Sequence, residues 1–135
     1  MTHADALRAI GDEQFVELTT FRRNGTPVAT PVWVARGAGD SLVVTTPTGS
    51  GKVKRLRHTP RVELRPCSRR GTVPDGAPVV MARGEVDRSD TAVAAAHRVL
   101  AEKYRFQFRV VMAIERVLRR GRIDRVIVRL SPETP

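Results

Sequence analysis

Short β-forming runs separated by turn signals constrain the fold of this chain more than any other feature of its sequence. The Asn24-Gly25 pair joins the runs Phe15–Phe21 and Val28–Arg36, and both residues of the pair can take the positive φ of a tight hairpin. Pro31 marks an interruption or an edge position in the second run, because proline cannot donate to a sheet ladder. Four further runs bring the predicted strands to six: Ser41–Thr46, Arg61–Cys67, Pro78–Asp87 and Ile123–Leu130.

Helices are predicted around these strands, two of them late in the chain. They cover Ala4–Ile10, Lys52–His58, Thr91–Tyr104 and Gln107–Arg120. Ser89 is a suitable N-cap for the third helix, and Pro60 stops the second. Strands in hairpin succession with late helices predict a single mainly β (α+β) domain over residues 1–135. We expect an antiparallel β-barrel with peripheral helices, because closing the sheet removes exposed strand edges.

Two of the predicted strands contain patterns with a structural meaning. Gly84 lies inside Pro78–Asp87, and a glycine within a strand indicates a bulge or a bend. In Ile123–Leu130, apolar residues alternate with charged ones, which predicts a strand with one solvent-facing side.

The formal net charge of +10 is concentrated in two segments. Ser50–Arg70 holds eight Lys or Arg residues against the single carboxylate of Glu63. His97–Arg129 holds ten against three acidic residues, so each segment has a net charge of +7. Basic patches of this kind attract a phosphorylated cofactor, a nucleic acid or an acidic membrane surface.

Several classes of protein are disfavoured by what the sequence lacks. No apolar stretch approaches the roughly 20 residues that a membrane span needs, and no signal-peptide core is present, so we expect a cytoplasmic protein without membrane association. The single cysteine, Cys67, allows no internal disulfide. His3, His58 and His97 have no metal-ligand spacing, so no metal site is expected. His58 and His97 are expected at the surface or on a helix face.

The segment Thr45–Lys52 runs from a predicted strand through a Gly/Ser loop into a basic helix. It is not a P-loop, because that motif needs glycine where Thr46 stands and Ser or Thr where Val53 stands. Nucleotide hydrolysis is therefore excluded. Free backbone N–H groups, hydroxyls and nearby cations still make the segment a candidate anion site. The alternative is a solvated basic helix that holds no ligand.

The same segment resembles the cofactor-phosphate element of the pyridoxamine-phosphate-oxidase-like flavoproteins. The resemblance rests on Thr46, Ser50-Gly51-Lys52, Leu56 and Pro60-Arg61-Val62. Other segments are similar to the actinobacterial branch of that family that uses the deazaflavin coenzyme F420: Leu18–Phe21, Asn24–Trp33, Ser50–Arg57, Lys103–Arg109 and Asp124–Leu130. The similarity spans almost the whole chain, and its specificity lies in the order of the segments.

This resemblance implies a split β-barrel homodimer that holds its cofactor at the subunit interface and transfers a hydride at the cofactor ring. Thr46, Ser50 and Lys52 would contact the cofactor phosphate. Arg55 and Arg57 would support them, and Thr45 and Gly51 belong to the same element. The strand segment Thr30, Pro31, Val32 and Trp33 would present backbone groups to the ring.

One departure from the family pattern bears on the cofactor. Flavin-mononucleotide oxidases carry an Arg and a Lys in the strand around Val28–Val34, and here that strand has no charge. This favours the deazaflavin over flavin mononucleotide (FMN). The predicted function is an F420-dependent oxidoreductase that acts on a small organic substrate, with no catalytic side chain assigned.

Two other functions remain open at this stage. A protein of the same fold can hold a flavin, F420 or haem without turnover. A basic nucleic-acid-binding barrel is the weaker alternative, because aromatic residues make up only 4% of the chain and single-strand binders need exposed stacking rings. Trp33 is either a pocket wall or a core residue, and Tyr104 is expected to pack rather than to bind. For Gln107–Arg120 we favour packing on the barrel or across a dimer over contact with a membrane or an acidic partner.

Overall fold

The computed structural model describes residues 2–118 and 125–133. The elements are α1 (His3–Ile10), β1 (Phe15–Phe21), β2 (Pro27–Val32), β3 (Ala35–Arg36), β4 (Leu42–Pro47), α2 (Gly51–Leu56), β5 (Arg61–Cys67), β6 (Val80–Asp87), α3 (Asp90–Tyr104), α4 (Phe106–Leu118) and β7 (Arg125–Pro132). The predicted start of the last strand, Ile123, and the predicted end of the last helix, Arg120, lie outside the described residues.

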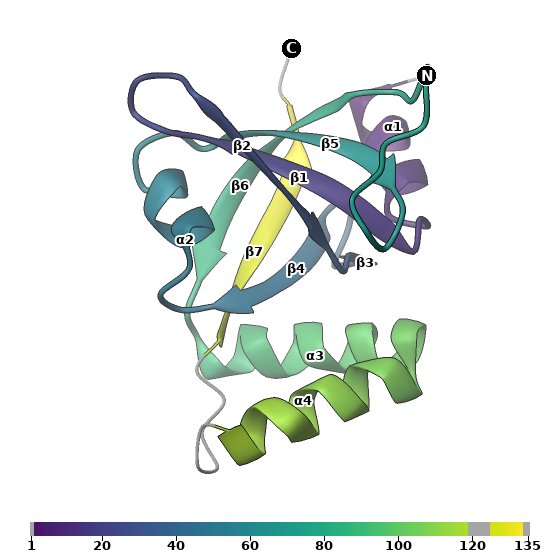
Figure 1. Cartoon of the computed structure of the whole chain (residues 1–135), viewed down its shortest axis with the longest axis vertical. Coiled ribbons are helices and arrows are strands. Elements are labelled where there is room, and N and C mark those ends of the chain that lie inside the picture. The colour runs from purple at the N-terminus through teal and green to yellow at the C-terminus, as the bar shows by residue number, and fades with distance from the viewer. Residues whose placement is uncertain (1, 119–124, 134–135) are drawn as a thin grey trace.

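All described strands form one antiparallel sheet in the order β2-β1-β5-β6-β7-β4-β3. The sheet curls on itself, so that β2 lies across the front of the barrel formed by the other strands (Figure 1). The predicted strand Val28–Arg36 is two strands, because the chain leaves β1 after Val32 and next pairs with β4 at Ala35. The crossing at Trp33 and Val34 closes the barrel at one end. The predicted antiparallel barrel with peripheral helices is confirmed.

The β1–β2 hairpin begins the sheet and sets its register. Phe21 pairs with Pro27, and Glu17 pairs with Pro31. Pro31 lies on β2, which has no second neighbour in the described sheet. Pro31 therefore takes the edge position that the sequence predicted as one option. Gly25 has φ +90°, but it is the only residue of the Asn24-Gly25 pair with a positive φ.

The barrel interior is filled by one apolar cluster. Alternate residues of the strands point into it, among them Val16, Leu18, Leu64 and Leu130, all fully buried. Helix α1 adds Leu7 and Ile10 at one end, and α2 adds Leu56. The alternation of the sequence thus becomes the inner face of a closed sheet.

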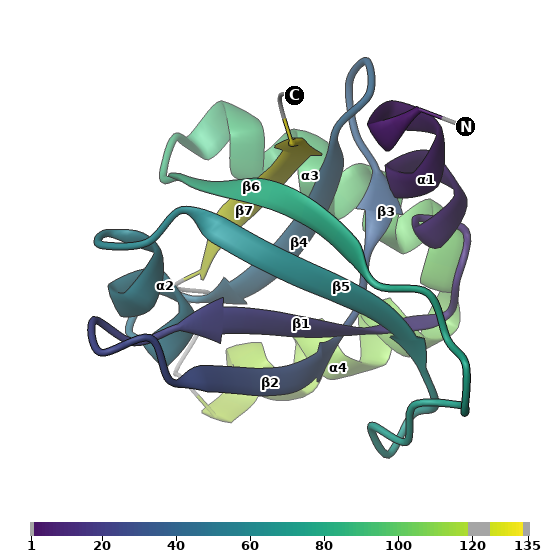
Figure 2. The same ribbon diagram turned by 90° about the horizontal axis from the view of Figure 1, so that it is seen from above.

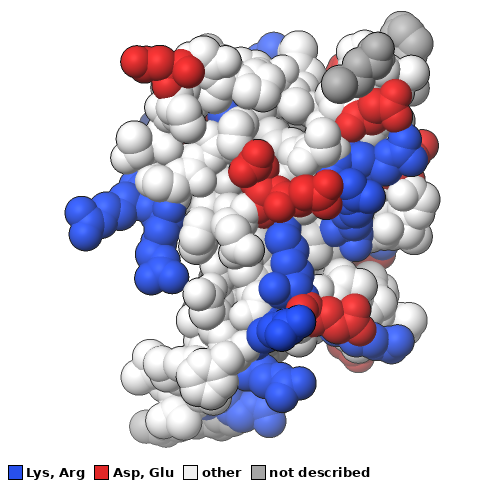
Figure 3. Space-filling view, turned by 90° about the vertical axis from the view of Figure 1, so that its right-hand side faces the viewer, with Lys and Arg blue, Asp and Glu red and all other residues white. Residues whose placement is uncertain are grey.

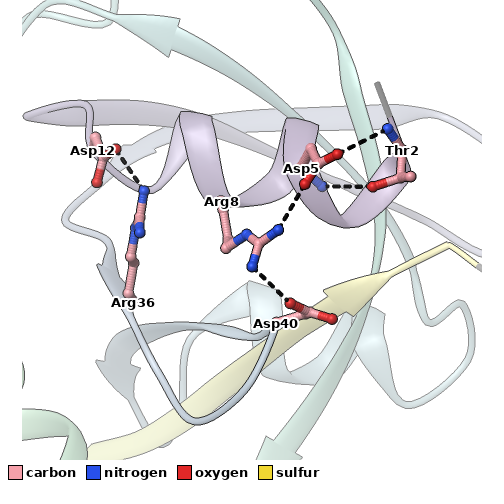
Figure 4. A network of polar contacts seen from close by, with 6 residues as sticks. All are labelled: Thr2, Asp5, Arg8, Asp12, Arg36 and Asp40. Carbon is pink, nitrogen blue, oxygen red and sulfur yellow. Dashed lines mark hydrogen bonds and ion pairs between the residues drawn. The ribbon is translucent and has the colours of Figure 1, made fainter.

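Helix α1 is held in place by a polar network on its outer side (Figure 4). Thr2 and Asp5 form a capping box, in which each side chain accepts from the other residue's backbone N–H. Arg8 pairs with Asp5 at 2.6 Å and with Asp40 at 3.3 Å, which links the helix to the β3–β4 turn. These side chains are exposed, so each pair contributes modestly to stability.

A second apolar cluster lies outside the barrel, under α3 and α4, which form a layer at one end of the molecule (Figure 1). It combines Ala35, Val43 and Ile127 from the sheet with Leu100 and Phe108 from the helices. The expectation that Ile123–Leu130 has one solvent-facing side is wrong, because the helices cover that side and Ile127 is fully buried. The arginines of this strand pair with carboxylates: Arg125 pairs with Glu115, where both side chains are largely buried, and Arg129 pairs with Asp87 while remaining partly exposed.

Gly84 does not form a bulge. The pairing of β6 with β7 runs without a shift from Ala82 to Asp87. A Cβ at Gly84 would lie 3.1 Å from Leu56 Cδ2 and 3.3 Å from Val62 Cγ1. The glycine therefore allows α2 to approach the sheet closely.

Candidate functional site

A pocket lies in the gap of the barrel, between the free parts of two strands. β2 pairs only with β1 in the described sheet, and β4 pairs with β3 only at Leu42 and Val43. The later residues of β4 therefore face β2 across a gap. The pocket in this gap has a volume of about 270 Å³.

Apolar side chains form one side of the pocket. They are Phe15, Pro31, Val32, Trp33, Val111 and Met112. Trp33 stacks on Tyr104 at a centroid distance of 5.1 Å and contacts Phe108 at 5.8 Å. Trp33 is thus both a pocket wall and a partner of the outer core, which joins the two readings that the sequence left open.

Cations lie at both ends of the pocket. Lys52 on α2 and Arg125 on β7 line it together with Thr45, Thr46 and Pro47 at the end of β4. Arg69, in the loop after β5, lines it as well. Helix α2 and this loop lie at opposite ends of the β1–β2 hairpin (Figure 2). None of the described residues that line the pocket carries a carboxylate.

The charge on Lys52 is in an unfavourable environment when no anion is bound. Partial burial, followed by repulsion from Arg55 and Arg125, lowers the pKa of Lys52. An anion placed beside Lys52 and Arg125 would offset this repulsion. The arrangement therefore suits a ligand group with negative charge, a phosphate among them.

Arg125 is oriented from behind by a carboxylate on α4. Its Nε donates to Glu115 Oε2 at 2.9 Å, and both side chains are largely buried. Its Nη1 donates to Thr45 Oγ1 at 3.5 Å. The Thr45 hydroxyl also lies 2.9 Å from Nε2 of His97 on α3. A polar chain thus connects both helices of the outer layer to the pocket.

Six of the residues predicted from the sequence line the pocket together: Pro31, Val32, Trp33, Thr45, Thr46 and Lys52. They come from segments up to about twenty residues apart, and the gap between β2 and β4 brings them to one place. Thr46 is almost completely buried and donates to Ser50 Oγ at 3.0 Å, so its hydroxyl proton is already used within the loop.

The other predicted residues do not line the pocket. Thr30 has a buried hydroxyl with no hydrogen-bond partner among the described residues. Arg55 turns toward β1, where its Nε donates to Thr20 Oγ1 at 2.6 Å. Its guanidinium covers Gly51, since a Cβ there would lie 2.5 Å from Nη1. Ser50 is the N-cap of α2, and exposed Arg57 is its C-cap.

Helix α2 is also shorter than predicted, with six residues instead of Lys52–His58. A single short helix has little dipole to offer, because nucleation and alignment need several turns. The positive character of the pocket therefore comes mainly from the side chains of Lys52, Arg69 and Arg125.

Sequence reasoning missed other contributors to the site, which are Phe15, Pro47, Arg69, Arg125, the α4 residues Val111 and Met112, and His97 behind the wall. Arg125 and His97 lie in the basic segment His97–Arg129, but nothing in that segment indicates that β7 pairs with β4. The structure shows this pairing, in which Thr45 lies opposite Ile127 and Pro47 lies opposite Arg125. Long-range strand pairing was the signal that the sequence did not provide.

The loop between β2 and β3 is fixed by two side chains of α3. Lys103 Nζ donates to the carbonyl oxygens of Gly11, Glu13 and Val34 at 2.6–2.7 Å. Tyr104 accepts from Val34 N–H at 3.0 Å and donates to the Gln14 carbonyl at 2.7 Å. The predicted packing role of Tyr104 is confirmed, and its hydroxyl is buried. Both residues hold the backbone next to Trp33.

A curled antiparallel sheet with a cationic cleft between two unpaired strand edges defines a split β-barrel. The family model described as pyridoxamine 5'-phosphate oxidase matches residues 3–134, and the chain belongs to that family. This result confirms the resemblance inferred from the sequence. No match was found among curated proteins.

Solved structures with the same fold have different described roles. A conserved hypothetical protein from Mycobacterium tuberculosis is 20% identical, with a TM-score of 0.68 over 99% of this chain and 82% of that one. A protein described as an F420 reductase is 19% identical, with a TM-score of 0.57 over 94% and 93%. The haem storage protein HutZ from Vibrio cholerae is 15% identical, with a TM-score of 0.64 over 100% and 93%. At these identities the similarity establishes the fold and no more.

Proposed function

We propose that this protein binds an anionic flavin-type cofactor, coenzyme F420 in the first place, and exchanges a hydride between it and a small organic substrate. The observation that carries the proposal is the pocket itself, with Lys52 and Arg125 at one end and the Trp33 side chain beside them. A phosphorylated cofactor with a flat ring needs this combination of positive charge and apolar wall.

Each group on the chain has a separate task in this proposal. Lys52 and Arg125 hold the phosphate, and Glu115 fixes the direction of Arg125. The free edge of β2 at Pro31 and Val32 offers backbone groups to the ring. Trp33 and Met112 exclude water from its face. The cofactor supplies the hydride chemistry, and the protein supplies binding and orientation.

Two observations favour F420 over the alternatives. The strand Pro27–Val32 has no charged residue, whereas the family resemblance implies an Arg and a Lys in this strand for FMN-dependent oxidases. No histidine lines the pocket among the described residues, so haem would lack the usual axial ligand on this wall. A non-catalytic cofactor carrier keeps the same pocket and is separated from an enzyme by a turnover test with reduced cofactor.

The only tryptophan of the chain gives a direct test of binding. Trp33 lines the pocket, so a bound cofactor ring in contact with it is expected to quench its emission. Titration of the protein with F420 and with FMN should give saturable quenching, tighter for F420. Free tryptophan at matched absorbance corrects for the inner-filter effect. Absence of saturable quenching by either cofactor, together with no binding by calorimetry, would overturn the proposal.

We further propose that the protein is a homodimer, with the second copy covering α4 and completing the pocket. A volume of about 270 Å³ is at the small end of ligand pockets, which span roughly 300–1,000 Å³. Helix α4 exposes an apolar face next to the pocket: Phe106, Val110, Val111, Ile114, Val117 and Leu118. In Figure 3 the lower left part of the molecule is free of charged side chains, with Lys and Arg side chains next to it. None of the described helices is long and apolar enough to cross a bilayer.

The Ile114→Glu variant tests this interface. Ile114 is 54% exposed in the single chain, so a carboxylate there costs little in a monomer but would be buried in the dimer. We expect wild type to be a dimer by light scattering and the variant to dissociate at least tenfold more readily. Val79→Glu, at an exposed apolar residue near α1, is the matched control and should remain dimeric. A monomeric wild type would refute this assignment.

A further inference from the structure

His97 lies behind the pocket wall and contacts it through one atom. Its Nε2 is 2.9 Å from Thr45 Oγ1, and its ring meets Phe108 edge-on at a centroid distance of 5.4 Å. The imidazole is half-buried and is not part of the pocket lining. Thr45, in contrast, belongs to the lining. The direct hydrogen-bonded path from His97 to a ligand therefore passes through the Thr45 hydroxyl.

The hydroxyl of Thr45 has one proton to give, and two arrangements of that proton are available. When Nε2 of His97 carries a proton, it donates to Thr45 Oγ1, and the Thr45 proton is free for the pocket. When Nε2 is bare, Thr45 donates to it, and the pocket loses this donor. Arg125 Nη1 approaches the same oxygen as a further donor at 3.5 Å, which is compatible with both arrangements, because the hydroxyl oxygen has two lone pairs.

We propose that His97 is a positioning residue that sets the direction of the Thr45 hydroxyl, and thereby decides whether this wall donates a hydrogen bond to a bound anion. The ligand group concerned is an anionic oxygen, of a phosphate or a carboxylate, held beside Arg125. The inference rests on the proposed function, because it concerns the same pocket. It adds the Nε2 proton of His97, on α3, to the groups that control binding.

The surroundings of His97 determine the direction of the coupling. Burial and then the positive charge of Arg125 lower the pKa of His97, whereas Glu115 on α4 acts in the opposite direction. His97 is therefore mostly neutral at pH 7. An anion that accepts from Thr45 favours a protonated Nε2, which both the imidazolium and the Nε2–H tautomer of the neutral ring supply. Ligand binding therefore raises the pKa of His97 to the extent that the neutral ring of the free protein carries its proton on Nδ1 and leaves Nε2 bare. By linkage, affinity increases as the pH falls through the pKa of the bound state, and levels off below that of the free state.

The test is a titration of the His97 ring by ¹⁵N NMR in the full-length protein, free and with F420 or FMN bound. The ring titration compares wild type with Thr45→Val, and cofactor affinity is compared in wild type, Thr45→Val and His97→Gln. His58, which is exposed, serves as the internal reference. We expect the cofactor to raise the pKa of His97 in wild type, and to raise it much less in Thr45→Val. Cofactor affinity should fall about three- to tenfold in Thr45→Val, the range for one hydrogen bond.

The pH dependence of binding separates this role from a structural one. Because a phosphate monoester itself titrates near pH 6, FMN binding varies with pH in every variant, and the informative quantity is the difference between variants. Cofactor affinity should depend on pH more strongly in wild type than in His97→Gln, and this excess is the part due to His97. The unfolding temperature of His97→Gln should equal that of wild type. An excess that persists in His97→Gln, or an equal pKa rise in wild type and Thr45→Val, would overturn the inference.

The outcome is distinguishable from failure of the proposed function. If wild type binds neither F420 nor FMN, the proposed cofactor is wrong, and inorganic phosphate replaces it as the probe. A rise in the pKa of His97 with phosphate that Thr45→Val abolishes would still support the link between His97 and the pocket. No difference between the two proteins would reject it.

Discussion

The Lys103→Met variant is expected to lose about 2–4 kcal/mol of its free energy of unfolding, because it leaves carbonyl oxygens without their donor. The ammonium group donates to three carbonyls, and the Val34 carbonyl is among them. Methionine keeps the apolar stem of the side chain and removes the charge. Burial lowers the pKa of Lys103. The contacts with Gly11 and Val34 are part-buried, so solvent water would replace the ammonium there only incompletely.

Urea denaturation followed by circular dichroism measures this loss. Lys54→Met is the matched control, since Lys54 is exposed on α2, and it should unfold within about 0.5 kcal/mol of wild type. A Lys103→Met variant as stable as the control would show that the carbonyls find other donors. Trp33 emission should also shift toward that of an exposed indole, because the adjacent Val34 backbone is released.

The Lys52→Ala variant is expected to weaken cofactor binding by about 1.5–3 kcal/mol, or roughly 10- to 150-fold in Kd, the range for a hydrogen bond to a charged group. Lys52 is the α2 side chain that lines the pocket, and an anion there offsets its repulsion with Arg125. The folded protein should be at least as stable as wild type, because the variant removes a partly buried charge beside two arginines.

Isothermal titration with F420 measures the loss, and Lys54→Ala controls for net charge. The two variants change the total charge equally, but Lys54 is exposed and does not line the pocket. Equal affinities of Lys52→Ala and Lys54→Ala would mean that binding depends on overall charge and not on this position. That result would remove Lys52 from the proposed site.

The strands could be predicted from the sequence because turn residues and alternating patterns act locally. The Asn24-Gly25 turn lies where expected, and β1 and β5 have the predicted bounds, whereas α2 ends at Leu56 and not at the predicted His58. The covered outer face of Ile127 could not be predicted in this way, since it depends on where α3 and α4 dock. Alternation with charged residues indicates a wet face only when nothing packs on it.

The candidate site was predictable in part for the same reason. Lys52 and Thr45 lie in a segment with a recognisable loop, so both were identified from local pattern and family resemblance. Arg55 was assigned with them, but its side chain extends to β1, where it donates to Thr20, and does not line the pocket. Arg125 lies on β7 and His97 lies on α3. Both reach the site because these two elements adjoin β4 in the closed barrel.

The contacts of Lys103 and Tyr104 have a consequence for the order in which this molecule matures. Both side chains reach back about ninety positions along the chain to the segment that precedes β1, and about seventy positions to the link between β2 and β3. During synthesis the early hairpins are complete long before these anchors leave the ribosome. A partly made chain therefore has strands but no rigid cleft, and capture of a ligand becomes possible only once the last third of the polypeptide has joined the first.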